Sequence, residues 1–532
     1  MTNEATLLNE LPWLVAERSP QSVALRDDTA SVSYAELSDD VRRFAGALSA
    51  LGLARQERVA IYLDKRRETV IASFGAPAQG AVFVPINPLL KAEQVAHILR
   101  DGGVRILVTS KERLKTLKTS LHGCTQLSHV ILAGDDTDLS GLGGIPVHSW
   151  TAILGAGALH RHRVIDTDIA AILYTSGSTG KPKGVVLSHR NMVAGAKSVA
   201  SYLDNRAGDV LLAALPLSFD AGFSQLTTAF HTGASVVLLN YLLPKDVVKA
   251  VVAHRVTGLT AVPPLWIQLT QVKWPESVSE HFRYFANTGG RMPLDTLTSL
   301  RTLLPRAKPF LMYGLTEAFR ATYLPPEEVD RRPDSIGKSI PNSEVLVLRP
   351  DGTVCDAHEP GELVQRGALV AQGYWNDAEK TAERFRPLPG REHGLVLPEI
   401  AVYSGDTVRR DEEGFLYFIG RVDEMIKSSG YRISPNEVEE VLYATQLVGE
   451  CAAFGVPHAT LGEAVIVVVT PRDAQAFDLA RLQALCRQQL PAYMVPAQIE
   501  VRAGPLPRNA NGKIDRKSIS GDYRASTQEA AQ

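Results

Sequence analysis

The amino-acid sequence predicts an α/β protein with more than one domain. Its 532 residues exceed the length at which a single hydrophobic core usually stops growing. Apolar runs of strand length alternate with segments of helical periodicity, which is typical of parallel α/β sheets. Hydrophobic residues make up 45% of the chain and charged residues 21%, as in ordinary globular proteins.

Local signals place the individual elements. Ser33 and Glu36 form a capping-box pattern at the start of a helix whose apolar residues recur at helical spacing. Ser188 is expected to cap a helix that begins at His189, which we interpret as a packing residue rather than a catalyst. Residues 521–532 are polar and are expected to be disordered. Strands are predicted over residues 59–63, 81–85, 105–109, 130–132, 210–217, 234–239, 259–262 and 464–470, and helices over 69–79, 91–101 and 479–489.

Charge, cysteine spacing and the chain ends narrow the possible functions. A net charge of −2 with interspersed signs gives no footprint for nucleic acid. The four cysteines (Cys124, Cys355, Cys451 and Cys486) are far apart and lack metal-ligand spacing, so reduced thiols are expected. The first residues lack the basic and apolar regions of a signal peptide, and the last residues carry no lipidation pattern. No run approaches the ~20 apolar residues of a membrane span. We expect a cytoplasmic protein without a transmembrane segment.

Residues 173–191 read LYTSGSTGKPKGVVLSHRN and are the most informative stretch of the chain. A strand-like run leads into a loop of glycines, hydroxyls and lysines, which can turn backbone N–H groups and positive charge toward a polyphosphate. A Walker A motif is excluded because Pro182 follows Lys181 where Ser or Thr is required. No Gly-x-Ser-x-Gly nucleophile elbow occurs here either.

Over its whole length this stretch resembles the phosphate loop of the AMP-forming adenylate superfamily, which contains acyl- and aryl-CoA synthetases, peptide-synthetase adenylation domains and luciferases. Residues 311–317 (LMYGLTE) and 506–516 (LPRNANGKIDR) resemble two further signatures of that superfamily. The resemblance implies a large N-terminal domain (1–422) with two packed α/β sheets before the phosphate loop and a β-rich subdomain. It also implies a small, mobile α+β C-terminal domain (423–520), followed by a polar tail (521–532).

The same resemblance implies roles for individual residues. Lys513 would bridge the substrate carboxylate and ATP, the Thr316 hydroxyl would meet the α-phosphate, and Glu317 would bind Mg²⁺. Asp423 would be the hinge between the domains, and Gly430 would line the tunnel for the thiol. Residues implied to bind ATP or AMP are Thr175, Ser176, Gly177, Ser178, Thr179, Gly180, Lys183, Gly289, Gly290, Arg291, Tyr313, Gly314, Thr316, Asp406, Arg421 and Arg432.

The substrate pocket is implied to contain Phe219, Asp220, Pro264, Trp266 and Gly289. Asp220 has two interpretations, which the sequence leaves open. Peptide-synthetase adenylation domains carry Phe-Asp here and use the carboxylate to hold the ammonium group of an amino acid. Asp is also a favoured helix N-cap residue, and a buried carboxylate without a partner would be costly.

The expected activity is activation of a carboxylic acid by ATP to an acyl-adenylate with release of pyrophosphate, followed by transfer to a thiol to give a thioester. The substrates and cofactors would be ATP, Mg²⁺ and either CoA or a pantetheinylated carrier protein. The alternative is a freestanding amino-acid-adenylating enzyme that loads an acyl carrier protein, and a more distant one is an inactive acyl-AMP or nucleotide sensor. Residues 62–66 (YLDKR) and 87–91 (NPLLK) resemble acyl-CoA ligases associated with exosortase systems. The sequence leaves monomer and dimer open.

Overall fold

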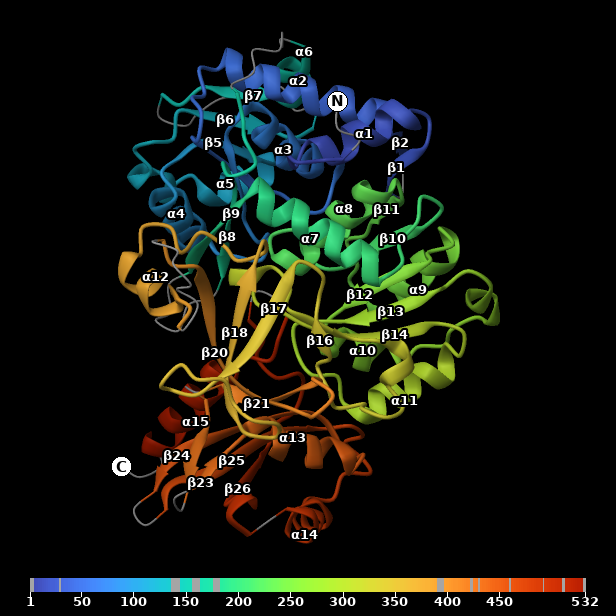
Figure 1. Cartoon of the computed structure of the whole chain (residues 1–532), viewed down its shortest axis with the longest axis vertical. Coiled ribbons are helices and arrows are strands. Elements are labelled where there is room, and N and C mark those ends of the chain that lie inside the picture. Colours follow the sequence, from blue (N-terminus) through green and yellow to red (C-terminus); the bar gives the residue numbers. More distant parts are fainter. Residues whose placement is uncertain are drawn as a thin grey trace.

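The computed structural model describes residues 4–27, 30–134, 144–155, 163–175, 182–389, 397–421, 424–428, 431–458, 461–490, 492–509 and 512–529. Figure 1 shows a large upper part, a third sheet in the middle and a small unit at the bottom formed by the C-terminal residues. Within these described residues, we find no helix with the length and apolar character needed to cross a membrane.

The first sheet has seven strands in the order β7-β6-β5-β3-β4-β8-β9. All neighbouring pairs are parallel except β8 with β9, whose antiparallel register places Thr175 opposite Lys183. The strands are β3 (Arg58–Tyr62), β4 (Val82–Pro85), β5 (Val104–Thr109), β6 (His129–Leu132), β7 (Val147–Ser149), β8 (Ile169–Thr175) and β9 (Lys183–Ser188).

The second sheet has nine strands in the order β16-β15-β14-β13-β12-β10-β11-β1-β2, with a parallel centre and antiparallel edges. Its strands are β1 (Val23–Arg26), β2 (Ser31–Ser33), β10 (Val210–Ala213), β11 (Ser235–Leu238), β12 (Gly258–Ala261), β13 (Tyr284–Asn287), β14 (Lys308–Tyr313), β15 (Thr322–Leu324) and β16 (Lys338–Ser339). The prediction that both sheets precede the phosphate loop is therefore wrong. The strands before the loop pair mainly with one another in the first sheet, and only β1 and β2 join the second.

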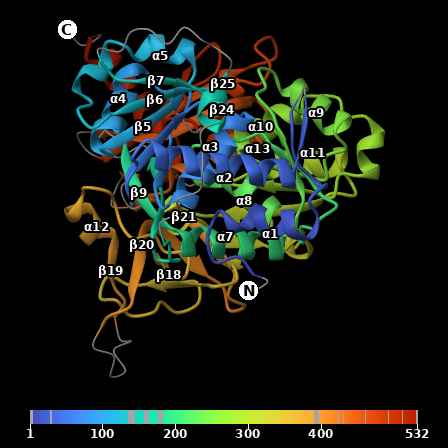
Figure 2. The same ribbon diagram turned by 90° about the horizontal axis from the view of Figure 1, so that it is seen from above.

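Helices lie between and around the two sheets, and Figure 2 shows α2, α3 and α8 across the centre of the large part. The capping box predicted at Ser33 and the N-cap predicted at Ser188 are confirmed at the starts of α2 and α7. The helices of the large part are α1 (Glu10–Arg18), α2 (Tyr34–Ala50), α3 (Arg67–Gln79), α4 (Ala92–Asp101), α5 (Lys111–Leu117), α6 (Trp150–Gly155), α7 (His189–Tyr202), α8 (Asp220–Thr232), α9 (Pro244–Ala253), α10 (Pro263–Leu269) and α11 (Leu294–Leu303).

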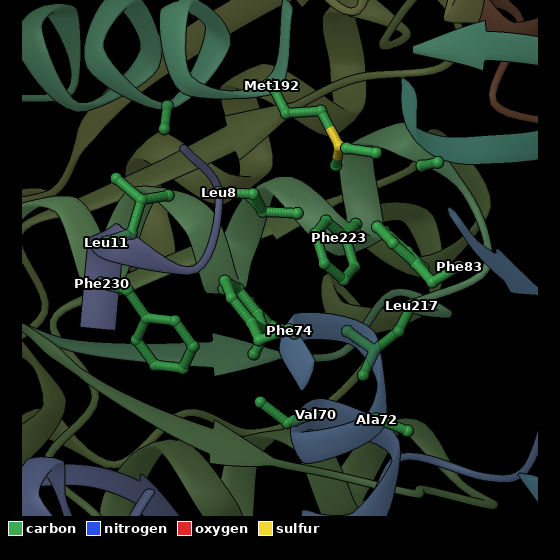
Figure 3. Packing of buried hydrophobic residues seen from close by; sticks show 14 of the residues in the cluster. Leu8, Leu11, Val70, Ala72, Phe74, Phe83, Met192, Leu217, Phe223 and Phe230 are labelled. Carbon is green, nitrogen blue, oxygen red and sulfur yellow. The ribbon is translucent and has the colours of Figure 1, made fainter. Parts of the chain in front are cut away.

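The main hydrophobic core joins residues of both sheets with residues of α2, α3, α7 and α8. Phe74 of α3 stacks on Phe223 of α8 with ring centroids 5.6 Å apart, and Phe83 of β4 lies 4.9 Å from Phe223 (Figure 3). His189 belongs to the same region: its ring is buried, its Nδ1 accepts a hydrogen bond from the Leu8 backbone N–H, and burial lowers its pKa to about 4. These contacts are consistent with His189 as a packing residue.

A third, antiparallel sheet follows the large part, as the prediction of a β-rich segment required. Its five strands are β17 (Ser343–Leu348), β18 (Gly361–Gly367), β19 (Phe385–Pro387), β20 (Ile400–Arg410) and β21 (Leu416–Arg421), with helix α12 (Ala378–Arg384) beside them. The register of β20 and β21 places Asp406 opposite Arg421. Gly337 immediately precedes β16 of the second sheet and forms a β-bridge with Leu416 of β21. It therefore connects the second and third sheets.

The C-terminal unit has a five-stranded sheet of β22 (Ile426–Ser428), β23 (Tyr431–Ile433), β24 (Val448–His458), β25 (Gly462–Pro471) and β26 (Gln498–Val501). Its helices are α13 (Pro435–Ala444), α14 (Leu479–Gln489) and α15 (Arg516–Glu529). The prediction of disorder from residue 521 is wrong as far as residue 529, where α15 ends. Ile519 and Tyr523 lie four residues apart on α15 and are both buried, so the helix has an apolar face that packs on β24.

Gly337 offers a test of the connection between the second and third sheets. It has φ +84°, and a Cβ there would overlap the carbonyl oxygen of Tyr323. Gly52 is the matched control, because it has φ +75° but open space around it. Gly52→Ala should cost about 1 kcal/mol from backbone strain alone, and Gly337→Ala should cost about 1–3 kcal/mol more because of the overlap. Denaturant unfolding of both variants measures this, and equal losses of stability would contradict the account.

Candidate active site

A cavity of about 1160 Å³ lies between the large part and the C-terminal unit. It collects residues that are far apart in the sequence. The residues predicted for the site that line it are Thr175, Lys183, Phe219, Asp220, Pro264, Gly289, Gly290, Arg291, Tyr313, Gly314, Thr316, Glu317, Asp406, Arg421 and Lys513.

The parallel strands of the second sheet explain why several of these residues meet. Strand β13 ends at Asn287 and is followed by Gly289 and Gly290, and β14 ends at Tyr313 and is followed by Thr316 and Glu317. Neighbouring parallel strands end at the same edge of a sheet, which is where ligands bind in open α/β sheets.

Asp406, on β20 of the third sheet, is a buried acceptor. The Tyr313 hydroxyl donates a hydrogen bond to its Oδ2, and the Arg421 guanidinium lies 3.5 Å from its Oδ1. In the part of the chain that the structure describes, Asp406 Oδ1 accepts no hydrogen bond. Burial raises the pKa of this carboxyl. A ligand that offers hydroxyl groups, as a ribose does, would satisfy the unpaired oxygen.

Glu317 is held by Tyr374, which sequence reasoning did not place in the site. The Tyr374 hydroxyl donates a 2.6 Å hydrogen bond to Glu317 Oε1, and Lys183 Nζ lies 5.6 Å from the centre of the tyrosine ring. Tyr374 reaches this position because it bridges to Val185 of β9. The Gly-Tyr-Trp motif at 373–375 resembles the family, but nothing in it points to Glu317, which is 57 residues away.

The described residues contain no cluster of three or more His, Cys, Asp or Glu side chains that could hold a metal. A Mg²⁺ ion here would therefore depend on Glu317 together with oxygens of the bound nucleotide. This fits the preference of Mg²⁺ for one or two carboxylates plus phosphates.

Lys513 enters the cavity from the C-terminal unit. Its backbone is fixed by two bonds with Asn509: the Asn509 N–H donates to the Lys513 carbonyl at 2.8 Å, and the Lys513 N–H donates to Asn509 Oδ1 at 3.1 Å. A Cβ placed on Gly289 would lie 3.0 Å from Lys513 Cε and 3.5 Å from Nζ, so the lysine lies directly over this glycine. Burial lowers the pKa of Lys513, while Asp220 and Asp406 favour its charged form. Residues 510 and 511, which precede Gly512 and Lys513, lie outside the described residues.

Polar contacts attach the C-terminal unit to the large part. Arg291 forms a 2.8 Å ion pair with Glu440 of α13, and Gln446 donates a hydrogen bond to Asp295 of α11. Arg291 therefore lines the cavity while its guanidinium contacts the C-terminal unit. Sequence reasoning missed this contact, because Glu440 lies far from Arg291 in the chain.

Asp220 has a partner that neither interpretation of the sequence anticipated. Arg320 Nη1 donates a 2.9 Å hydrogen bond to Asp220 Oδ2, and the two side chains are only 2% and 8% exposed. The N-cap interpretation is wrong: Phe219 occupies the N-cap of α8, no side chain caps the helix, and Asp220 is the first helical residue.

Trp266 does not line the cavity, so the prediction that it belongs to the substrate pocket is wrong. It is fully buried, packs against Phe285, and its Nε1 donates to the Ala261 carbonyl. The face of α10 that lines the cavity carries Pro264, Ile267 and Gln268. These residues share one face because they lie three and four positions apart along the helix.

Several predicted residues cannot be placed. Ser176, Gly177, Ser178, Thr179 and Gly180 of the phosphate loop lie outside the described residues, as do the predicted hinge Asp423 and the predicted tunnel residue Gly430. Arg432 is described only by its backbone, which belongs to β23.

Comparison with known proteins agrees with this geometry. Residues 13–375 match the AMP-binding enzyme family, and residues 437–513 match the AMP-binding enzyme C-terminal domain. The long-chain-fatty-acid–CoA ligase of Escherichia coli O157:H7 is 30% identical over 93% of this chain and 90% of its own. A feruloyl-CoA synthase of Amycolatopsis sp is 31% identical over 95% of this chain and 97% of its own.

Among solved structures, the o-succinylbenzoate CoA synthetase of Bacillus subtilis in complex with its acyl-adenylate intermediate superposes with a TM-score of 0.80. It is 27% identical and the match covers 96% of this chain and 97% of the other. The same synthetase has also been solved with ATP and a magnesium ion. The expected α/β fold is confirmed. The chain belongs to the AMP-binding enzyme family and is an AMP-forming acid–thiol ligase, which activates a carboxylic acid with ATP and then forms a thioester.

Proposed function

We propose that the protein converts a small-molecule carboxylic acid to its CoA thioester, with Mg²⁺ as the metal and CoA rather than a carrier protein as the acceptor. The observation that carries this proposal is the position of Lys513, which lies over Gly289 in the cavity that also contains Glu317 and Asp406. The choice of CoA is supported by relatives that are named CoA ligases and that match this chain over about nine-tenths of their length.

The lining residues suggest how ATP would be held. The unpaired Asp406 Oδ1, with Arg421 beside it, suits the ribose hydroxyls, and Tyr313 and the loop of Gly289 and Gly290 would face the adenine. Thr175 and Lys183 flank the predicted phosphate loop. The loop residues that would bind phosphate are Ser176, Gly177, Ser178, Thr179 and Gly180. The segment with Gly314 and Thr316 would meet the α-phosphate. A Mg²⁺ ion held by Glu317 would neutralise phosphate charge. Phe219, Pro264 and Gly289 would contact the acyl group.

The first half-reaction needs positioning and charge neutralisation more than a protein nucleophile. The substrate carboxylate attacks the α-phosphorus, the bond to the β-phosphate oxygen breaks, and pyrophosphate leaves with the bonding electron pair. Lys513 would stabilise the negative charge shared by the carboxylate and the α-phosphate during this step. A thiol then attacks the acyl carbon and loses its proton to solvent, and AMP departs with the electron pair of the broken C–O bond.

Both half-reactions would share one cavity if the C-terminal unit turns between them. We propose that residues 423–520 form the moving domain against residues 1–422, with Asp423 as the hinge. The arrangement described above, with Lys513 in the cavity, would be the one in which the acyl-adenylate forms. The Arg291–Glu440 pair and the Gln446–Asp295 hydrogen bond would hold the C-terminal unit in that position. After rotation, Lys513 would leave the cavity, Gly430 would line the path of the thiol, and Arg432 would approach the phosphate.

We also propose a cytoplasmic location. All four cysteines are buried free thiols, which is consistent with a reducing compartment, and both ATP and CoA are available there.

The role of Lys513 gives a direct test of the proposed function. Fatty acids of different length and aryl acids are first screened for acid-dependent ATP–pyrophosphate exchange and for CoA-dependent AMP release. With an active acid, Lys513→Ala should slow exchange roughly 100-fold and leave thiolation of supplied acyl-adenylate nearly intact. Lys273→Ala, at an exposed lysine outside the cavity, should change neither reaction. Equal losses in both half-reactions would refute the role of Lys513, and thioester formation only with a carrier protein would refute the proposed acceptor.

Tyr374 tests the proposed metal site. Tyr374→Phe removes the hydrogen bond to Glu317 without removing the ring, so the Mg²⁺ concentration for half-maximal exchange should rise about tenfold and excess Mg²⁺ should restore the rate. Tyr417→Phe is the matched control, because it breaks a 3.0 Å tyrosine–carboxylate bond to Asp411 away from the cavity lining. An unchanged Mg²⁺ requirement in Tyr374→Phe would rule out this function of the tyrosine.

A further inference from the structure

The Asp220–Arg320 pair spans the wall of the substrate cavity. Asp220 lines the large cavity, whereas Arg320 does not and instead borders a separate space of about 20 Å³ behind it. A substrate would therefore meet the carboxylate, while the compensating guanidinium approaches from the protein side. The Arg320 side chain is only 2% exposed, so its positive charge is enclosed by protein.

The surrounding structure keeps Arg320 in this position. Phe319, immediately before it, has φ +57°, a conformation that is rare outside glycine, and its ring occupies the place where a side chain at Gly195 would lie. Arg320 Nη1 also donates to the Phe319 carbonyl at 2.9 Å, and Gln365 Nε2 donates to the Arg320 carbonyl at 2.7 Å. The guanidinium is thus fixed against Asp220 by contacts on both its side chain and its backbone.

This arrangement leaves one oxygen of Asp220 for a substrate. Oδ2 is bonded to Arg320, and no hydrogen bond to Oδ1 is found from the residues that the structure describes. The carboxylate is paired with one cation, Arg320, and it also favours the charged form of a second cation in the cavity, Lys513. A substrate ammonium would be a third cation around one buried carboxylate, which is electrostatically unfavourable. A hydroxyl could donate to Oδ1 without adding charge.

We infer that Arg320 is a specificity-determining residue that turns Asp220 into an acceptor for an uncharged donor, so that the enzyme favours hydroxy acids over amino acids of the same shape. This inference rests on the proposed function, since it concerns the acid that the same cavity activates. In a cavity specific for amino acids, the substrate ammonium would be the cation that pairs with Asp220. Here Arg320 is that cation.

The test compares acids that differ in one group. Acid-dependent ATP–pyrophosphate exchange is measured for hydroxy, amino and unsubstituted members of matched series, with the group on carbon 2 or carbon 3 and with aliphatic and aryl chains. In the wild-type protein, kcat/KM for the hydroxy acid of the best series should exceed that of its amino counterpart about tenfold or more. The unsubstituted acid should fall between them, because it leaves Oδ1 unpaired.

Variants of the pair separate charge from shape. Arg320→Gln should raise kcat/KM for the amino acid about tenfold, because the uncompensated Asp220 can then take an ammonium group. Arg320→Lys keeps the positive charge and should keep the wild-type preference. The double variant Asp220→Asn with Arg320→Gln removes both charges and should show no gain for the amino acid. If Arg320→Gln fails to fold, the wild-type ranking and the double variant still decide.

Each outcome has a distinct meaning. A wild-type enzyme that prefers the amino acid, or an unsubstituted acid that surpasses its hydroxy counterpart, would overturn the inference while the acid–thiol ligase activity stands. A gain for the amino acid in the double variant as large as in Arg320→Gln would also overturn it, because the gain would then come from space rather than charge. Absence of exchange with every acid would instead count against the proposed function.

Discussion

The position of Lys513 in the cavity depends on how the C-terminal unit is held against the large part of the chain. Arg508 pairs with Glu450 and donates a 2.9 Å hydrogen bond to the Gly512 carbonyl, and Arg516 pairs with Glu424 and Glu439. These contacts lie on both sides of Lys513 and fix the segment that carries it. The lysine therefore reaches Gly289 only when the C-terminal unit contacts the large part as it does here, so the position of one ammonium group depends on the contact between the two parts.

Each charge that the cavity buries has a counter-charge that comes from another element. Asp220 of α8 pairs with Arg320, which follows β14, and Asp406 of β20 faces Arg421 of β21. Buried ions that lose a partner are strongly destabilising, so such pairs fix the relative positions of their elements. The two pairs differ in what they leave open. Asp406 Oδ1 accepts no hydrogen bond from the described residues, and Asp220, which lines the cavity, is bonded to Arg320 through Oδ2 alone.

Local signals in the sequence were reliable where short-range physics decides the structure. The capping boxes at Ser33 and Ser188 and the bounds of α14 follow from patterns within a few residues. The residues after β13 and β14 that the signatures predict for the site line one cavity, because the ends of neighbouring parallel strands meet at one edge of a sheet. Contacts between distant residues were not predictable: Arg320 lies 100 residues from Asp220, and Tyr374 lies 57 residues from Glu317. The helix beyond residue 521 was missed because its apolar face is narrow within a polar segment.

We propose that the contact between α11 and the segment that follows α13 belongs to the arrangement in which the acyl-adenylate forms, with Lys513 in the cavity. The most direct test introduces Asp295→Cys and Gln446→Cys, whose native side chains share a hydrogen bond, and joins them with a short bis-maleimide. The four native cysteines are buried, so the reagent should select the new pair. The account predicts that the cross-linked protein keeps acid-dependent ATP–pyrophosphate exchange and loses CoA thioester formation. Thioester formation at an undiminished rate after complete cross-linking would contradict it.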